Sequence, residues 1–80
     1  MQKAKREDIK AHIEKHIGNV IENPADDLID SGLLDSLEAM GLLVSLENKF
    51  GVKFSFAEYS QQGFLCLNRL VETIAELERK

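Results

Sequence analysis

The chain has 80 residues, with 10 lysines and arginines against 14 aspartates and glutamates and a formal net charge of −4 at pH 7. We expect one domain, residues 1–80, because a chain this short buries only roughly 60 % of its unfolded surface and leaves little scaffold for a deep catalytic cleft. The acidic balance disfavours nucleic-acid binding, and no apolar run approaches the roughly 20 residues of a membrane span. Its one cysteine, Cys66, has no internal disulfide partner, so we expect a cytoplasmic protein. We also expect a monomer.

The first periodic segment, residues 4–17, predicts a helix. Ile9, Ile13 and Ile17 recur every fourth residue and form one apolar stripe. Gly18 follows and is typical of a left-handed helix end. His12 and His16 flank the stripe at the spacing of two metal ligands on one helix. No third ligand accompanies them on this helix, so we expect no metal site.

Residues 18–34 contain glycines, Pro24 and several turn-forming polar residues, and they predict a long loop. Loops longer than about 12 residues in a compact domain are often functional. A second helix is predicted from Asp35 to Phe50. Asp35 or Ser36 caps its start, and Gly51 ends it.

The second helix is apolar on two sides. At 100° per residue its core side comprises Ala39, Leu42, Leu43, Leu46 and Phe50. On the opposite side lie Leu37, Met40 and Val44, with Gly41 among them. Since a bundle this small cannot bury both sides between its helices, we expect the second side to face a partner protein. The alternative is that the neighbouring loop covers this side. Glu38 and Glu47 lie beside it and are expected to pair with basic residues of a partner.

The remaining chain predicts two further helices. Residues 54–61 suggest a short helical turn, and residues 67–79 a longer helix, with Cys66 or Asn68 near its start. One face of that helix carries Leu67, Leu70, Val71, Ile74 and Leu77. The expected fold is therefore all-α, a small four-helix bundle with three longer helices, one short helix and a long loop after the first helix.

Ser36 stands where the loop turns into the second helix. A hydroxyl there is accessible, and the free N–H groups of a helix start favour a phosphate. From spacing alone, a simple capping role for Ser36 is the commoner interpretation. Every charged residue between positions 22 and 47 is acidic, which predicts either a surface that attracts basic partners or one that is only solvated.

Residues 32–37 read GLLDSL and resemble the phosphopantetheine attachment motif of acyl and peptidyl carrier proteins, whose core is Asp-Ser-Leu. The resemblance extends to DLIDSG at 27–32, LENKFGV at 46–52 and LVETI at 70–74. It therefore covers nearly the whole chain, at the typical length of the family.

This resemblance implies a carrier rather than an enzyme. A phosphopantetheinyl transferase would move 4'-phosphopantetheine from coenzyme A to Ser36, between Asp35 and Leu37. The arm would then hold an acyl or aminoacyl group as a thioester. A ligase that activates an acyl group or an amino acid would load it, and an acyltransferase or synthase would receive it. The partner-binding residues would be Glu38, Met40, Gly41, Val44 and Glu47.

Two departures bear on the cargo. Fatty-acid carriers usually have an acid where this chain has Gly41, and Lys49 interrupts the acidic run after Glu47. The LLDS form at 33–36, and the segment from Glu58 to Val71, look closer to the D-alanyl carrier proteins. We therefore expect a small amino acid, or another short acyl group, rather than a long fatty chain.

The sequence leaves three other functions open. Residues 27–38 partly match a calcium-binding EF-hand loop, but Ile29 offers no side-chain oxygen at the third position and Pro24 interrupts the entering helix. A serine hydrolase would need a base beside Ser36, and the motif supplies none. An unmodified helical interaction module is the third alternative, against which the intact attachment motif argues.

Overall fold

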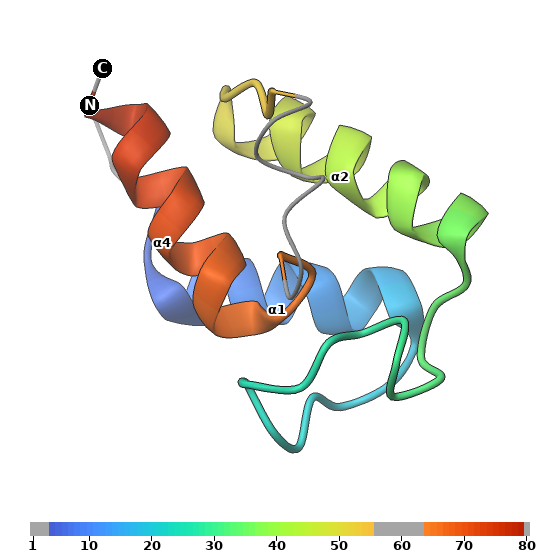
Figure 1. Ribbon diagram of the computed structural model, residues 1–80. Helices are drawn as coiled ribbons and strands as arrows, with labels where there is room; N and C mark the ends of the chain where they lie inside the picture. The colour runs from blue at the N-terminus through green and yellow to red at the C-terminus, as the bar shows by residue number, and fades with distance from the viewer. Residues whose placement is uncertain (1–3, 56–63, 80) are drawn as a thin grey trace.

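The computed structural model describes residues 4–55 and 64–79 of the chain. In these ranges it consists of three α-helices without strands: α1 (Arg6–Ile17), α2 (Ser36–Phe50) and α4 (Leu67–Glu78) (Figure 1). The predicted all-α class is confirmed. Of the predicted short helix over 54–61, residues 54 and 55 are not helical and the others lie outside the described residues, so the fourth helix of the expected bundle is not confirmed.

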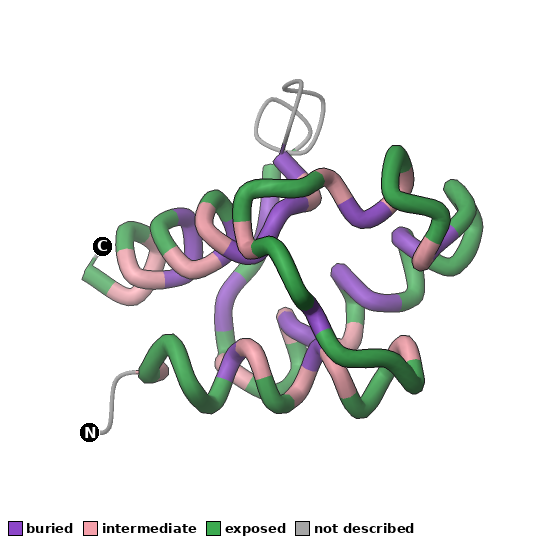
Figure 2. The backbone as a smooth tube through the Cα atoms, turned by 90° about the horizontal axis from the view of Figure 1, so that it is seen from below, coloured by how far each residue is buried: buried purple, intermediate pink, exposed green. Residues whose placement is uncertain are grey.

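The core lies where the three helices meet. α1 contacts both α2 and α4, and each helix turns its buried residues inward (Figures 1 and 2). The innermost helical side chains, at most 1 % exposed, are Ile9, Ile13, Leu42, Leu46, Leu67, Leu70 and Ile74. Branched aliphatic side chains at helical spacing interlock in this way because their removal from water is the main driving force for folding.

Local chemistry sets the helix ends. Gly18 (φ 72°) and Gly51 (φ 69°) adopt the left-handed conformation, and their N–H groups donate to Glu14 O and Glu47 O. Both predicted glycine stops are confirmed. α1 begins at Arg6 rather than at residue 4, and α4 ends at Glu78 rather than at residue 79. Cys66 is the N-cap of α4, where its Sγ accepts a hydrogen bond from Arg69 N.

The loop between α1 and α2 is held to the start of α4. Leu28 is buried, and its N–H donates to Leu65 O at 3.0 Å. Asn68 N donates to Pro24 O, also at 3.0 Å. The loop therefore reaches Ser36 from a segment whose backbone is fixed to the fold. None of the described helices combines the length and apolarity that crossing a bilayer requires.

Candidate functional site

The start of α2 is closed by a reciprocal cap. Asp35 is the N-cap, and its Oδ1 accepts a hydrogen bond from Glu38 N at 2.7 Å. The Glu38 carboxylate in turn accepts one from Asp35 N at 3.0 Å. An acid followed three residues later by glutamate is the sequence pattern of such a capping box. Of the two predicted capping residues, the structure therefore selects Asp35 and leaves Ser36 without a capping role.

Ser36 is the first residue of α2, and it is exposed. The cap occupies the N–H groups of Asp35 and Glu38, whereas those of Ser36 and Leu37 have no acceptor within the helix, as at any helix start. Backbone donors in this position favour a phosphate group. Leu34, only 5 % exposed, is embedded in the core two residues earlier and fixes the approach of the chain. The local geometry therefore fits a phosphodiester on the Ser36 hydroxyl.

An exposed apolar strip follows Ser36 along α2. Leu37, Met40 and Val44 are 84 %, 50 % and 51 % exposed, whereas Leu42 and Leu46, on the other side of the helix, are fully buried. The prediction that α2 has one core side and one outward apolar side is confirmed among the described residues. The loop after α1 does not cover this strip, which we call the apolar strip.

The two glutamates predicted beside the strip are both engaged within the chain. Glu38 belongs to the cap. The half-buried Glu47 accepts a hydrogen bond through Oε2 from Phe54 N at 2.8 Å, because the chain turns back along α2 after Gly51. Each carboxylate keeps its charge near the strip, but each also has a structural partner.

Two histidines of α1 lie against the side of α2 next to the strip, an arrangement that was not predicted from the sequence. His12 Nε2 lies 2.7 Å from Ser45 Oγ, and the rings of His12 and Phe50 meet edge to face at 5.9 Å. One turn away, His16 Nε2 lies 4.0 Å from where a Cβ of Gly41 would stand. Histidines four apart on α1 thus meet small residues four apart on α2, a match that the sequence could have indicated.

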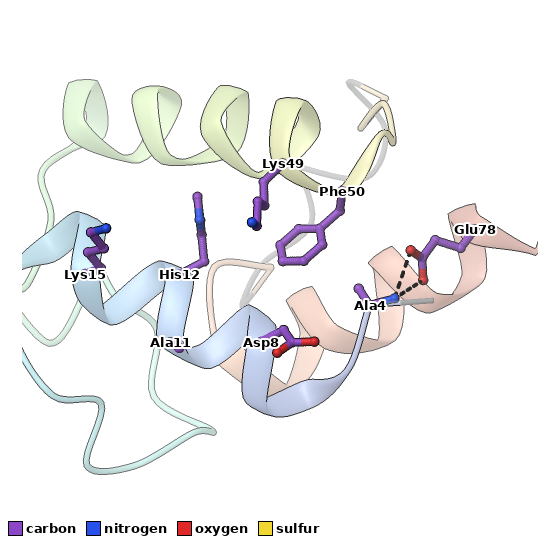
Figure 3. Close-up of a pocket in the computed structure, with 8 residues that line it drawn as sticks. All are labelled: Ala4, Asp8, Ala11, His12, Lys15, Lys49, Phe50 and Glu78. Carbon is purple, nitrogen blue, oxygen red and sulfur yellow. Dashed lines mark hydrogen bonds between the residues drawn. The ribbon is translucent and has the colours of Figure 1, made fainter. Parts of the chain in front are cut away.

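A groove of about 560 Å³ lies beside this contact, between α1, the last turn of α2 and the end of α4 (Figure 3). Lys15 and His12 of α1 and Lys49 of α2 line one part of it. Asp8 and Glu78 line another part, where both carboxylate oxygens of Glu78 accept hydrogen bonds from Ala4 N. In Figure 3, Lys49 reaches from α2 towards α1 close to His12.

Burial lowers the pKa of His12 below its usual value of 6.5, and His16, Lys49 and Lys15 lower it further because each carries or can carry positive charge. The imidazole is therefore held neutral at neutral pH. It bonds to Ser45 rather than Ser36, and its cationic neighbours disfavour the imidazolium that a general base must form. The arrangement does not provide the base that a hydrolase built on Ser36 would need.

This pKa gives a pH dependence of stability. Unfolded chains bind the proton first as the pH falls through 6.5, so the free energy of unfolding is expected to decrease from pH 7.5 to pH 5.5 and to level off once folded His12 is also protonated. His12→Gln should keep a polar partner for Ser45 and make this decrease smaller. Urea unfolding of both proteins at the two pH values is the measurement. An equal decrease in the variant would show that His12 is not responsible.

The side chains of the predicted calcium loop serve other purposes. Asp27 Oδ1 accepts hydrogen bonds from Ile29 N and Asp30 N, and Asp35 and Glu38 form the helix cap. No group of three or more histidine, cysteine, aspartate or glutamate residues within the described ranges is arranged to hold a metal ion.

Comparison with known proteins places this geometry in a class. Residues 7–74 match the family described as phosphopantetheine attachment site. The match spans most of the chain and includes α2 with Ser36 at its start, so the chain belongs to this family. The protein accordingly bears a covalently attached 4'-phosphopantetheine group, and it carries substrate rather than being an enzyme itself.

Within this family, the chain is similar to several D-alanyl carrier proteins. The chain is 40 % identical to the D-alanyl carrier protein of Streptococcus uberis over 53 residues, which are 66 % of this chain and 67 % of that protein. It is 33 % identical to the D-alanyl carrier protein of Streptococcus sanguinis over 75 residues, 88 % of this chain and 95 % of that protein. For that of Staphylococcus xylosus the identity is 35 % over 60 residues, 74 % and 77 % of the two chains. The expected likeness to D-alanyl carrier proteins is confirmed.

Proposed function

We propose that this protein carries D-alanine as a thioester on a phosphopantetheine arm attached to Ser36, and presents it to partner enzymes. The observation that carries the proposal is an exposed serine hydroxyl that is free of the helix cap and stands at the head of an exposed apolar strip. The names of its relatives support D-alanine as the cargo. Residues 1–80 would act as one carrier domain, a monomer in the cytoplasm.

Ser36 and its two neighbours would have different roles in attachment of the arm. The Ser36 hydroxyl would attack the pyrophosphate of coenzyme A on a phosphopantetheinyl transferase, losing its proton and forming a phosphodiester while 3',5'-ADP leaves. Asp35 would keep the first turn of α2 ordered through its cap, which leaves the Ser36 hydroxyl accessible. Leu37, which is almost fully exposed, would contact the transferase. The thiol at the end of the attached arm supplies the group that forms the thioester.

The partner face would consist of Met40, Gly41 and Val44 between the two glutamates, Glu38 and Glu47. An exposed apolar surface on a small domain commonly marks a binding site. A ligase that activates D-alanine would dock there to load the arm, and an acyltransferase would dock there to receive the cargo. Since both glutamates also have partners within the chain, their contribution to docking would be mainly electrostatic.

The proposal is tested in two stages by intact-mass measurement. Incubation with a broad-specificity phosphopantetheinyl transferase and coenzyme A should add the mass of one arm. Further incubation with ATP, D-alanine and a D-alanine-activating ligase should add one alanyl group, which hydroxylamine removes because it cleaves thioesters. Failure of the first stage would favour an unmodified interaction module. Success of the first stage with failure of the second would support the carrier function but refute D-alanine as the cargo. Loading of hexanoyl and octanoyl groups would be measured for comparison.

A further inference from the structure

Basic side chains gather along the edge of α2 that faces α1. They are Lys15 and His16 of α1 and Lys49 of α2, which surround the neutral His12 and which we call the basic flank. Lys15, His16 and Lys49 are exposed, and all three raise the positive potential at His12. Across the parts of the chain that the structure describes, neither Lys15 nor Lys49 forms an ion pair. Their charge is therefore available to a partner.

The basic flank borders the apolar strip. At 100° per residue, Leu37, Gly41, Ser45 and Lys49 form one row on α2, which starts in the apolar strip and runs beside the row of Met40 and Val44. The close approach of His16 to Gly41 and the hydrogen bond between His12 and Ser45 place α1 against that row. An enzyme that covers the strip therefore reaches the basic flank on the side of α1.

On the other side of the strip the charge is opposite. At 100° per residue, Ser36 and Glu47 border Met40 there, and Glu47 is the acid of that border. The other acid of α2, Glu38, stands at the start of the helix, where it belongs to the cap. Along the second half of α2 the strip thus lies between the charge of Glu47 and the basic flank. Two borders of opposite sign select one orientation of a docked protein, because reversing it would bring like charges together.

We propose, building on the proposed function, that the basic flank is a second part of the docking surface, and that it binds carboxylates of the ligase that loads the arm. Distance along the helix favours the ligase over the transferase. Gly41 and Lys49 lie roughly 8 and 20 Å beyond Ser36 along the axis of α2. A transferase must contact the helix start to reach the Ser36 hydroxyl, whereas a ligase acts at the far end of the arm and can sit over the second half of α2.

Charge reversal tests the proposal on the arm-bearing protein. In the double variant Lys15→Glu with Lys49→Glu, the ligase KM is expected to rise about tenfold with little change in kcat, since long-range attraction is lost and repulsion replaces it. The kcat/KM of the wild type should fall as salt is added, and that of the variant should fall much less or rise. Arm attachment by the transferase should change far less than ligase loading.

Two comparisons separate charge from other effects. Lys10→Glu changes the charge on a different side of α1, where Lys10 pairs with Glu14, and it should leave the ligase KM near that of the wild type. Gly41→Glu places a carboxylate beside His16 and should raise KM more than the neutral Gly41→Gln does. Thermal melting of each variant checks that it is folded.

The outcomes distinguish this inference from the function on which it rests. No arm on the wild type would refute the carrier function itself. Normal attachment and loading in the double variant would refute only the docking role of the basic flank. A lower KM in the double variant would overturn the assigned charge, because the ligase surface opposite the flank would then be basic.

Discussion

Ser36→Ala is expected to abolish arm attachment completely and to leave the fold almost unchanged. Attachment needs the hydroxyl oxygen itself, and alanine has none. Stability should change by no more than about 0.5 kcal/mol, because Ser36 is exposed and the cap is formed by Asp35 and Glu38. Intact mass after incubation with transferase and coenzyme A measures attachment, and circular dichroism at 222 nm together with a thermal melt measures the fold.

Serines elsewhere in the chain provide the internal control. Ser31→Ala should accept the arm at the wild-type rate, since Ser31 belongs to the loop, where its hydroxyl donates to Leu28 O. An arm found on Ser36→Ala would place the attachment site elsewhere. Loss of helical signal in Ser36→Ala would mean that the serine supports the fold in a way that the capping geometry does not indicate.

Leu46→Ala is expected to lower the free energy of unfolding by about 2–5 kcal/mol, because Leu46 is fully buried and its truncation leaves a cavity. That loss is a large part of the stability of a domain this size, roughly 4–12 kcal/mol. One kcal/mol shifts the melting temperature of a small domain by about 4–8 °C. Leu46→Ala should therefore melt about 10 °C or more below the wild type, measured by circular dichroism or calorimetry.

Met40→Ala is the matched control on the same helix. Met40 is half-exposed, so its truncation should cost less than about 1 kcal/mol. Met40→Ala is also expected to weaken loading by the ligase, whereas folded Leu46→Ala protein should still be loaded, because Leu46 lies outside the apolar strip. Equal destabilisation by the two changes would show that the apolar strip is covered by another part of the fold.

The features that local chemistry decides were predictable from the sequence. Gly18 and Gly51 end their helices because a residue without a side chain adopts the left-handed conformation at little cost. The acid-to-glutamate spacing of the cap and the division of α2 into two sides also follow from residues within one helix. For the same reason the position of Ser36 at a helix start was predictable, although which residue forms the cap was not.

The features that depend on two distant segments were not predicted. Phe50 was expected on the core side of α2; it packs against the core but is only partly buried at the helix end, where its ring meets that of His12 edge to face. Glu47 was expected to pair with basic residues of a partner, and its contact within the chain was not foreseen: the segment beyond Gly51 brings Phe54 N to its carboxylate. The basic flank depends on how α1 packs against α2. The spacing of His12 and His16 matches that of Gly41 and Ser45, but this match alone does not set which helices pack together.

The attachment of the loop to the start of α4 has a consequence for how cargo travels. The backbones of Leu28 and Pro24 are hydrogen-bonded to those of Leu65 and Asn68, and Leu34 is buried in the core, so the segment leading to Ser36 is anchored to the fold. The thiol would then move relative to the domain only through the prosthetic arm, around the fixed position of the Ser36 oxygen. Every docked enzyme would therefore meet the thiol at a distance set by the arm alone, and lengthening the loop by a few residues would not extend that reach while these two bonds remain.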